Sequence, residues 1–245
     1  MTTEVNLVAI AILGFIIVTI TWFISTLPFL LPYQILLTSQ SKKIGCKLSI
    51  EHILAVYIFV YYLTGVLSFT GIPSIMDIVQ NSFGIITPTG LNFPPDEINL
   101  LPFRWLTEGV HPYIENILLF IPLGFMLPCI WKRYEGLWPT ALSGMAFSVI
   151  IELSQLFNHR ITDIDDLLMN TLGALMGWVI FRLLKDHLAK LQVRISVQNT
   201  RIEKFPLLLR KEAWFYMAIA FAGMFLVFYP FLRSLLYPLL RSLFN

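Results

Sequence analysis

The sequence predicts an all-α protein, a polytopic bundle of transmembrane helices, from its composition and from the lengths of its apolar runs. Of 245 residues, 57% are hydrophobic and 13% are charged, whereas a soluble domain usually carries about 25% charged residues. Apolar runs long enough for the bilayer core recur along the chain. About six spans are expected, at residues 5–26, 50–69, 113–131, 138–157, 167–184 and 213–231.

Aromatic residues near the ends of these runs support the boundaries. Tryptophan and tyrosine are enriched where a transmembrane helix meets the two membrane surfaces. Such residues occur at Trp22, Tyr113, Trp131, Trp138, Trp214 and Tyr229. We therefore expect each run to form a helix that ends within a few residues of these positions.

The basic residues predict the orientation, because short cytoplasmic loops are enriched in lysine and arginine. Thirteen of the seventeen fall on one side of the membrane, with three at 42–47, two at 132–133 and eight at 182–211. The other side receives only Arg104, Arg160, Arg233 and Arg241. Both termini are therefore expected outside, together with the loop at 71–112.

The chain is expected to be one membrane domain with three segments. Residues 1–97 hold two N-terminal transmembrane helices and an outer loop, and residues 98–182 form a core. Residues 183–245 hold a basic cytoplasmic loop, the last transmembrane helix and an outer interfacial tail. No nucleic-acid partner is expected, because the basic residues are scattered between apolar runs instead of forming one patch with aromatics.

Small and polar residues share one face on each of the fourth and fifth expected helices, at about 100° of rotation per residue. These residues are Ala141, Gly144, Ser148, Glu152 and Gln155 on one helix, and Asp166, Asn170, Gly173 and Gly177 on the other. The connection between the helices is short, so they are antiparallel neighbours. We expect the two faces to pack together, with Gly173 and Gly177 allowing a close approach.

Glu152 is the strongest candidate for a functional residue. At about 1.5 Å per residue, it lies about 9 Å below the outer loop. An ionisable residue inside a span is costly and usually functional, although a carboxyl that only holds helices together is the alternative. Asn116 enters the third span from the same side and can join Glu152, Gln155 and Asn170.

Three acids precede or begin the fifth helix, namely Asp163, Asp165 and Asp166. Capping by Thr162 and the helix dipole explain one or two of them. Together with Glu152 they place four potential negative charges near one positive charge, Arg160. A raised carboxyl pKa, Arg104 folding in from the outer loop, or a bound divalent cation would each offset them. The spacing matches no specific metal motif, so the metal stays unknown.

Three motifs follow one another in the middle of the chain: Glu115-Asn116-Ile-Leu-Leu-Phe-Ile-Pro122-Leu-Gly124-Phe, Ile151-Glu152-Leu-Ser-Gln155-Leu-Phe and Arg160-Ile-Thr-Asp163-Ile-Asp165-Asp166-Leu-Leu-Met-Asn170-Thr-Leu-Gly173. In this order they resemble the VanZ-like family of bacterial membrane proteins. The resemblance covers about residues 98–182, which we therefore expect to be the VanZ-like core. The first two spans and the segment after residue 182 carry no recognisable motif.

The resemblance implies a multi-pass protein of the bacterial cell membrane. Some family members are associated with resistance to teicoplanin and related lipoglycopeptides. A proposal at the level of the family places it among intramembrane enzymes that act on lipid or polyprenyl head groups. No cofactor follows from this, apart from the divalent cation considered above.

Two functions are therefore expected as alternatives, and membrane lipids are partners in both. The first is an enzyme that modifies the head group of an outer-leaflet lipid, with Glu152, Asp163 or Asp166 as catalytic residues. Its substrate would contact Asn116, Gln155, Arg160, Asn170 and Arg104. The second is a non-catalytic envelope protein that binds a lipid-linked cell-wall precursor or the lipid tail of the antibiotic. A transporter is less favoured, because no inverted repeat is visible.

Overall fold

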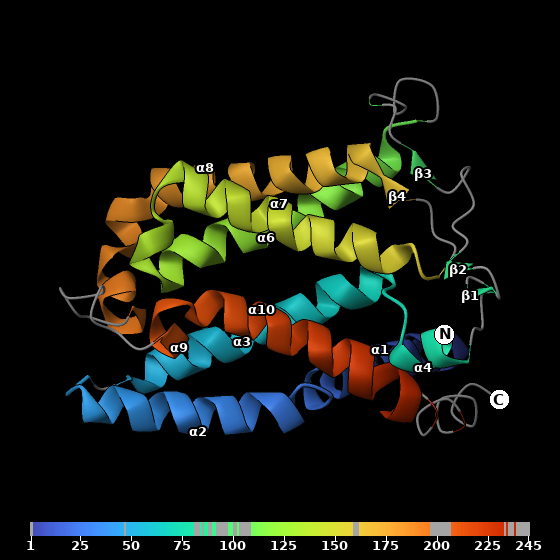
Figure 1. Cartoon of the computed structure of the whole chain (residues 1–245), viewed down its shortest axis with the longest axis horizontal. Helices are drawn as coiled ribbons and strands as arrows, with labels where there is room; N and C mark the ends of the chain where they lie inside the picture. Colours follow the sequence, from blue (N-terminus) through green and yellow to red (C-terminus); the bar gives the residue numbers. More distant parts are fainter. Residues whose placement is uncertain are drawn as a thin grey trace.

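The computed structural model describes residues 2–46, 48–80, 84, 86–87, 90–91, 98–99, 102, 109–158, 162–196, 207–232, 234 and 238. The long helices in these ranges lie along a common axis in Figure 1. They are α2 (Leu27–Lys43), α3 (Ile50–Thr70), α6 (His111–Ile130), α7 (Leu137–Gln155), α8 (Ile164–Ile195) and α10 (Glu212–Ala222). Shorter or flanking elements are α1 (Thr2–Ile24), α4 (Ile75–Val79), η2 (Lys132–Tyr134), α9 (Leu207–Arg210) and the π-helical η4 (Gly223–Leu232).

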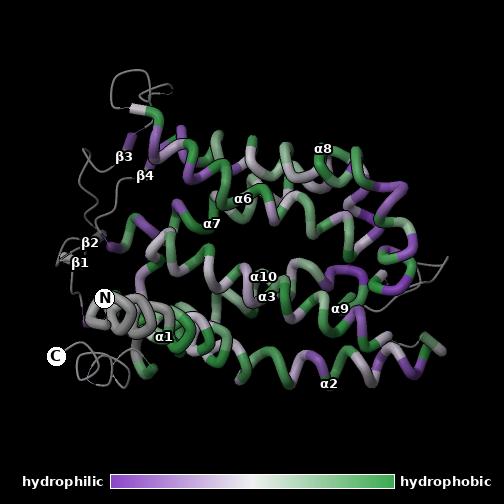
Figure 2. Tube along the Cα trace, turned by 180° about the vertical axis from the view of Figure 1, so that it is seen from behind, coloured by the Kyte–Doolittle hydropathy of each residue, from purple (hydrophilic) through white to green (hydrophobic). Residues whose placement is uncertain are grey.

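The helical, multi-pass membrane architecture is confirmed. In the described part of the chain, four helices are long and apolar enough to cross a membrane: Ile50–Val79, His111–Ile130, Leu137–Gln155 and Ile164–Ile195. A fifth candidate combines Leu13–Ile24 with Leu27–Lys43, two segments bent by 49°. Glu212–Phe228 is apolar but shorter. Hydrophobic residues extend along the helices, whereas hydrophilic residues gather at both ends of the bundle (Figure 2).

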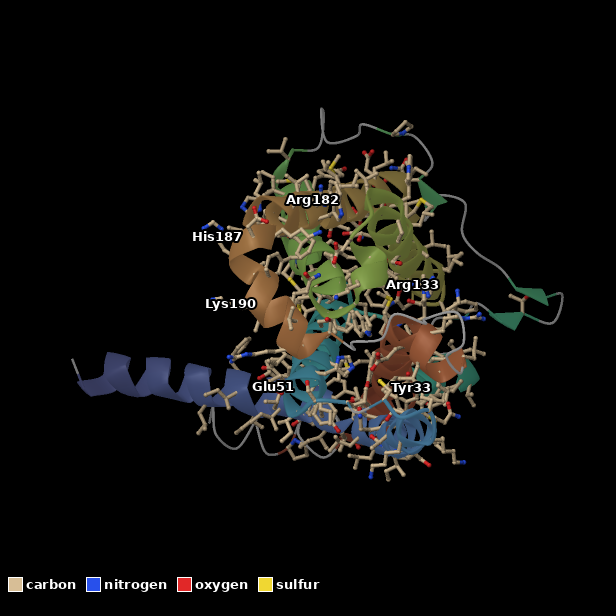
Figure 3. All side chains as sticks on the ribbon, turned by 90° about the vertical axis from the view of Figure 1, so that its left-hand side faces the viewer. Tyr33, Glu51, Arg133, Arg182, His187 and Lys190 are labelled. Atoms are coloured by element: carbon tan, nitrogen blue, oxygen red, sulfur yellow. The ribbon has the colours of Figure 1, made fainter. Side chains whose placement is uncertain are left out.

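Helix α2 was not expected, because the sequence interpretation placed a loop between spans 5–26 and 50–69. Its first turn contains a proline, which lacks an N–H that would in any case have no helical partner there. A second proline, Pro32, lies inside the helix. Leu30 and Leu37 are fully buried against the bundle, so tertiary packing compensates for the prolines. Helix α1 extends away from the bundle where α2 begins (Figure 3).

Helix α8 ends at Ile195, eleven residues beyond the expected end of the span at 184. Its last turns lie across one end of the bundle (Figure 1). Hydrogen bonds fix them there: Gln192 Nε2 donates to the carbonyl of Pro128 at 3.0 Å and to Glu135 Oε1 at 2.9 Å. The segment expected to begin a loop is therefore helical because it packs on the ends of other helices.

Helices α6 and α8 touch backbone to backbone. A β-carbon on Gly177 would lie 2.0 Å from the carbonyl oxygen of Ile121, and one on Gly173 would lie 2.3 Å from that of Ile117. The sequence interpretation expected these glycines to face α7, and this was wrong. A row of small residues on one face shows where another helix can approach closely, but it does not identify which helix packs there. Helix α7 instead meets α8 near Ala174.

Two short strand pairs lie beyond the helices. Strands β1 (Ile86–Thr87) and β2 (Gly90–Leu91) are antiparallel. Strands β3 (Ile98–Asn99) and β4 (Thr162–Asp163) are parallel, with Asn99 opposite Asp163. The second pair therefore joins the segment before α6 to the residues that begin α8.

Replacing Gly177 with alanine should destabilise the protein, because the added methyl group forces α6 and α8 apart. We expect a loss of about 2 kcal/mol, typical of overpacking. Gly65→Ala is the matched control, since nothing lies within 4 Å of a β-carbon at this helical glycine. The measurement is the thermal midpoint of both purified variants in mild detergent. Equal midpoints would contradict the close contact.

Candidate functional site

The ends of α3 and α7 and the beginnings of α6 and α8 meet at one end of the bundle, which we call the Glu152 end. Asp163 caps α8 there: its Oδ1 accepts from the backbone N–H of Asp165 at 2.9 Å. The same oxygen accepts from Asn99 Nδ2 at 2.9 Å. Asp163 therefore holds the start of α8 and the β3 segment in place, which is the structural role that its position favours.

Glu152 lies one turn from the end of α7, and its side chain is only 6% exposed. Its Oε2 accepts from the backbone N–H of Asp163 at 3.1 Å. The carboxylate thus bridges α7 to the first residues of α8. This confirms that the Glu152 and Asp163 regions meet, as the antiparallel connection predicted.

Amide side chains link the helices around this carboxylate. Asn116 Nδ2 of α6 donates to Asp166 Oδ1 of α8 at 2.6 Å. Asn170 Nδ2 of α8 donates to Ser148 Oγ of α7 at 2.9 Å. Asn116 was expected to join the polar group, and the other three residues were expected on the polar faces of α7 and α8. All four are thus paired across α6, α7 and α8.

The end of α3 also belongs to the site, which the sequence interpretation missed. Gln155 Nε2 donates to the carbonyl of Thr70 at 2.7 Å, and Asn158 Nδ2 donates to that of Gly71 at 2.7 Å. Gly71 adopts a left-handed conformation, with φ of 67°, that ends α3. The acceptors are backbone carbonyls, so no side-chain pattern in α3 could have indicated them.

Two acceptor atoms at the Glu152 end have no hydrogen-bond partner among the described residues: Gln155 Oε1 and Asn170 Oδ1. Both side chains are buried, at 6% and 2% exposure. An unpaired buried acceptor costs about 1–3 kcal/mol, so native structures pair nearly all of them. Other unpaired atoms, on Gln34, Gln40 and Ser196, lie on α2 or just after α8. The two unpaired atoms at the Glu152 end are both amide oxygens, and they lie at the same end of the bundle as the buried Glu152 carboxylate.

The acids of this end do not form a metal-ligand group within the described ranges. No set of three or more His, Cys, Asp or Glu side chains there could hold a metal ion. The carboxylates are divided between different bonds, since Asp163 caps a helix and Asp166 binds Asn116. Arg104 and Arg160, expected to balance the negative charge, lie outside the described residues, so this part of the expectation stays a prediction.

A second buried polar cluster lies at the opposite end of the bundle, which we call the Glu212 end. His52 Nε2 of α3 lies 2.8 Å from Glu212 Oε1 of α10, with the two side chains 1% and 2% exposed. Trp131 Nε1 donates to Glu212 Oε2 at 2.8 Å. His52 Nδ1 lies 2.7 Å from the carbonyl oxygen of Ile195 at the end of α8.

The partners of His52 restrict where its protons lie. A carbonyl oxygen only accepts, so Nδ1 must donate to Ile195. One further proton then lies between Nε2 and Glu212, which leaves the pair neutral overall. The cluster joins α3, α8, α10 and the residue after α6. Sequence reasoning missed it, because single residues far apart in the chain form no pattern.

Glu135 secures α8 beside this cluster. Its carboxylate accepts from Lys185 Nζ at 2.5 Å, and its backbone carbonyl accepts from Trp178 Nε1 at 2.9 Å. Burial acts to raise the pKa of the Glu135 carboxyl, but the bonds from Lys185 and Gln192 outweigh it and hold the pKa below its ordinary 4.5. The carboxylate therefore stays ionised around neutral pH.

The fold and this site define a class of protein: a multi-pass helical membrane protein with a buried polar cluster where four helices meet. Residues 59–185 match the VanZ/LLP1 family, and the chain belongs to this family. The match begins inside α3, earlier than the resemblance at 98–182 suggested. This agrees with the contacts that α3 makes at the Glu152 end.

Among curated proteins, the chain is 31% identical over 98 residues to Protein VanZ of Enterococcus faecium. The aligned region covers 40% of this chain and 60% of VanZ, so the chain spans less than two thirds of that relative. No solved structure matches the chain.

His52→Leu should destabilise the protein strongly, since it leaves the Glu212 carboxylate buried without its partner. Breaking a buried pair typically costs about 3–5 kcal/mol. His187→Leu is the control, because this histidine is exposed on α8. We expect the thermal midpoint to fall for the first variant alone and to recover in part for His52→Leu with Glu212→Leu. A small and equal change in the thermal midpoint of His52→Leu and His187→Leu would contradict the stabilising role of the His52–Glu212 pair.

Proposed function

We propose that this VanZ-like protein acts on the head group of an outer-leaflet lipid in the bacterial cell membrane, with the Glu152 end as the site. The proposal includes six crossings and both termini outside. In it, α1 and α2 together supply one crossing, and α10 with η4 supplies the last. The basic residues support this orientation, because Arg133, Arg182 and Lys190 surround the Glu212 end (Figure 3).

One observation carries the proposal: a buried carboxylate shares the Glu152 end with two unpaired amide oxygens. Gln155 Oε1 and Asn170 Oδ1 can only accept hydrogen bonds. They therefore suit a ligand that presents hydroxyl or amide donors, such as a glycosyl or peptide head group. Phosphate presents acceptors instead, and its recognition would fall to Arg104 and Arg160.

In the enzymatic form of the proposal, Glu152 serves as the general base. It would take the proton of a hydroxyl whose oxygen attacks the phosphorus of the head group. The bond from phosphorus to the leaving alcohol oxygen breaks, and that oxygen takes the proton back from Glu152, while Gln155 and Asn170 orient the head group. Its neighbours hold the carboxylate in place, since Asp163 N–H donates to Oε2. Asp166 would act by positioning Asn116, because the two side chains are already bonded.

A second candidate function is binding without catalysis, and one observation favours it. Asp163 is already bonded to Asn99 of β3, and Asp166 is bonded to Asn116 of α6, so both acids hold the fold together. In this form, the Glu152 end would hold a lipid-linked cell-wall precursor or the lipid tail of a lipoglycopeptide of the teicoplanin type. Sequestration would then reduce the access of the antibiotic to its target.

Lipid analysis separates the two functions. Membrane lipids are profiled by mass spectrometry in cells with the parent protein, with Glu152→Gln and with no protein. If the enzymatic form holds, a modified head group appears with the parent and disappears with the variant, because Gln keeps the volume but cannot accept a proton. Asp186→Asn, an exposed position on α8, is the control and should match the parent. An identical lipid profile with and without the parent would exclude the enzyme.

Cysteine labelling tests the orientation. In a background without native cysteines, Val110→Cys at the Glu152 end should react with a membrane-impermeant maleimide in intact cells. Lys190→Cys at the Glu212 end should react only after permeabilisation. Both positions are exposed. The reverse pattern would overturn the orientation and move the site to the inner leaflet.

A further inference from the structure

An apolar groove opens on the surface of the bundle beside the Glu152 end. Its volume is about 270 Å³, and three segments line it. The lining side chains include Pro73, Ile78, Leu153, Phe157, Phe221 and Phe225. The three segments are residues 73–78 (the turn after α3, and α4), residues 150–157 (the end of α7 and the residues that follow it) and residues 221–225 (the end of α10 and the start of η4).

The groove offers almost no polar contacts. Ser154 is the one hydroxyl side chain that lines it, and its Oγ already donates to the carbonyl of Ile151 at 2.7 Å. Phe221 and Phe225 stack with their ring centroids 5.5 Å apart, so one wall is a continuous aromatic surface. A groove of this composition excludes polar head groups and suits hydrocarbon.

The groove and the polar cluster lie at the same depth. Leu153 lines the groove on the turn of α7 that places Glu152 and Gln155 in the buried cluster. The turn after α3 connects them: the Thr70 carbonyl accepts from Gln155, and Pro73 lines the groove three residues later. A molecule that lies in the groove therefore ends beside the cluster.

The surroundings identify what fills the groove. Two lining side chains, Ile150 and Leu153, are 40% and 55% exposed, as expected for a surface that faces lipid tails. Water has no partners in such a groove, and an empty space loses dispersion contacts. The hydrocarbon available at this depth of a bilayer is acyl chain.

We propose that this groove holds one acyl chain of a glycerolipid whose head group lies at the Glu152 end. The inference rests on the proposed function and deepens it by assigning the substrate's tail to a second, separate surface. The groove selects for an acyl-anchored molecule, and the amide oxygens select for its head group. A soluble sugar or peptide could bind the amide oxygens but would leave the groove empty.

Photolabelling in vesicles tests the groove. The purified full-length protein is reconstituted in phosphatidylcholine and phosphatidylglycerol vesicles that contain a phosphatidylglycerol with a diazirine on its acyl chain. After illumination, labelled peptides are mapped by mass spectrometry. We expect label on residues 150–157 and 221–225 above other lipid-facing segments. Even labelling of all lipid-facing segments would overturn the proposal.

Two tryptophan variants of α7 make the test specific. Leu153→Trp fills the groove and should lower its labelling at least threefold, whereas Leu142→Trp should not. Both leucines are about equally exposed, at 55% and 53%, but Leu142 does not line the groove. Labelling that persists in folded Leu153→Trp would overturn the proposal. A groove label that excess polyprenyl phosphate displaces, and that unlabelled phosphatidylglycerol does not displace, would also overturn it.

The parent protein separates the groove from the proposed function, because the two have different readouts. An unchanged lipid profile in cells, together with preferential groove labelling in vesicles, would remove the enzymatic function and leave the tail site intact. A changed lipid profile together with even labelling of all lipid-facing segments would keep the function and overturn the groove.

Discussion

The backbone contact between α6 and α8 is the constraint on which the rest of the structure depends. Gly124, Gly173 and Gly177 leave no room for a β-carbon, so neither helix can slide or rotate without a clash. The contact fixes the beginning of α6 beside that of α8, which brings Asn116 within 2.6 Å of Asp166. Two of the motifs that resemble the VanZ-like family lie on these helices, so the motifs specify the helix packing as well as the site.

The two ends of the bundle handle buried polar groups differently. At the Glu212 end, both ring nitrogens of His52 and both carboxylate oxygens of Glu212 have partners. These bonds fasten helices, and two other buried atoms at this end, Gln34 Nε2 and Ser196 Oγ, are unpaired among the described residues. At the Glu152 end, Gln155 and Asn170 each keep one unpaired oxygen. This incomplete pairing lowers the stability of the protein, and functional sites commonly have this effect. The two unpaired amide oxygens are the observation from which a function is proposed for the Glu152 end.

Sequence reasoning succeeded where a regular pattern existed. Hydropathy located α3, α6 and α7 to within a few residues, and helical periodicity grouped Glu152 with its polar neighbours. It failed where the outcome depended on the partner: no helix was expected at α2, which packs on the bundle, and Gly173 was matched to the wrong helix. His52 and Glu212 could not have been paired, because 160 positions separate them and only the fold brings them together.

The central claim is that the unpaired oxygens of the Glu152 end exist for a ligand, and Asn170→Leu tests it most directly. Leucine removes a buried acceptor, and Ser148 can then bond to its own helix. The measurement is the head-group modification of the proposed function, detected in the lipid profile and divided by the amount of folded protein in membrane extracts. The account predicts that the variant folds as well as the parent or better and loses the modification. A modification that merely follows the amount of folded protein would contradict it.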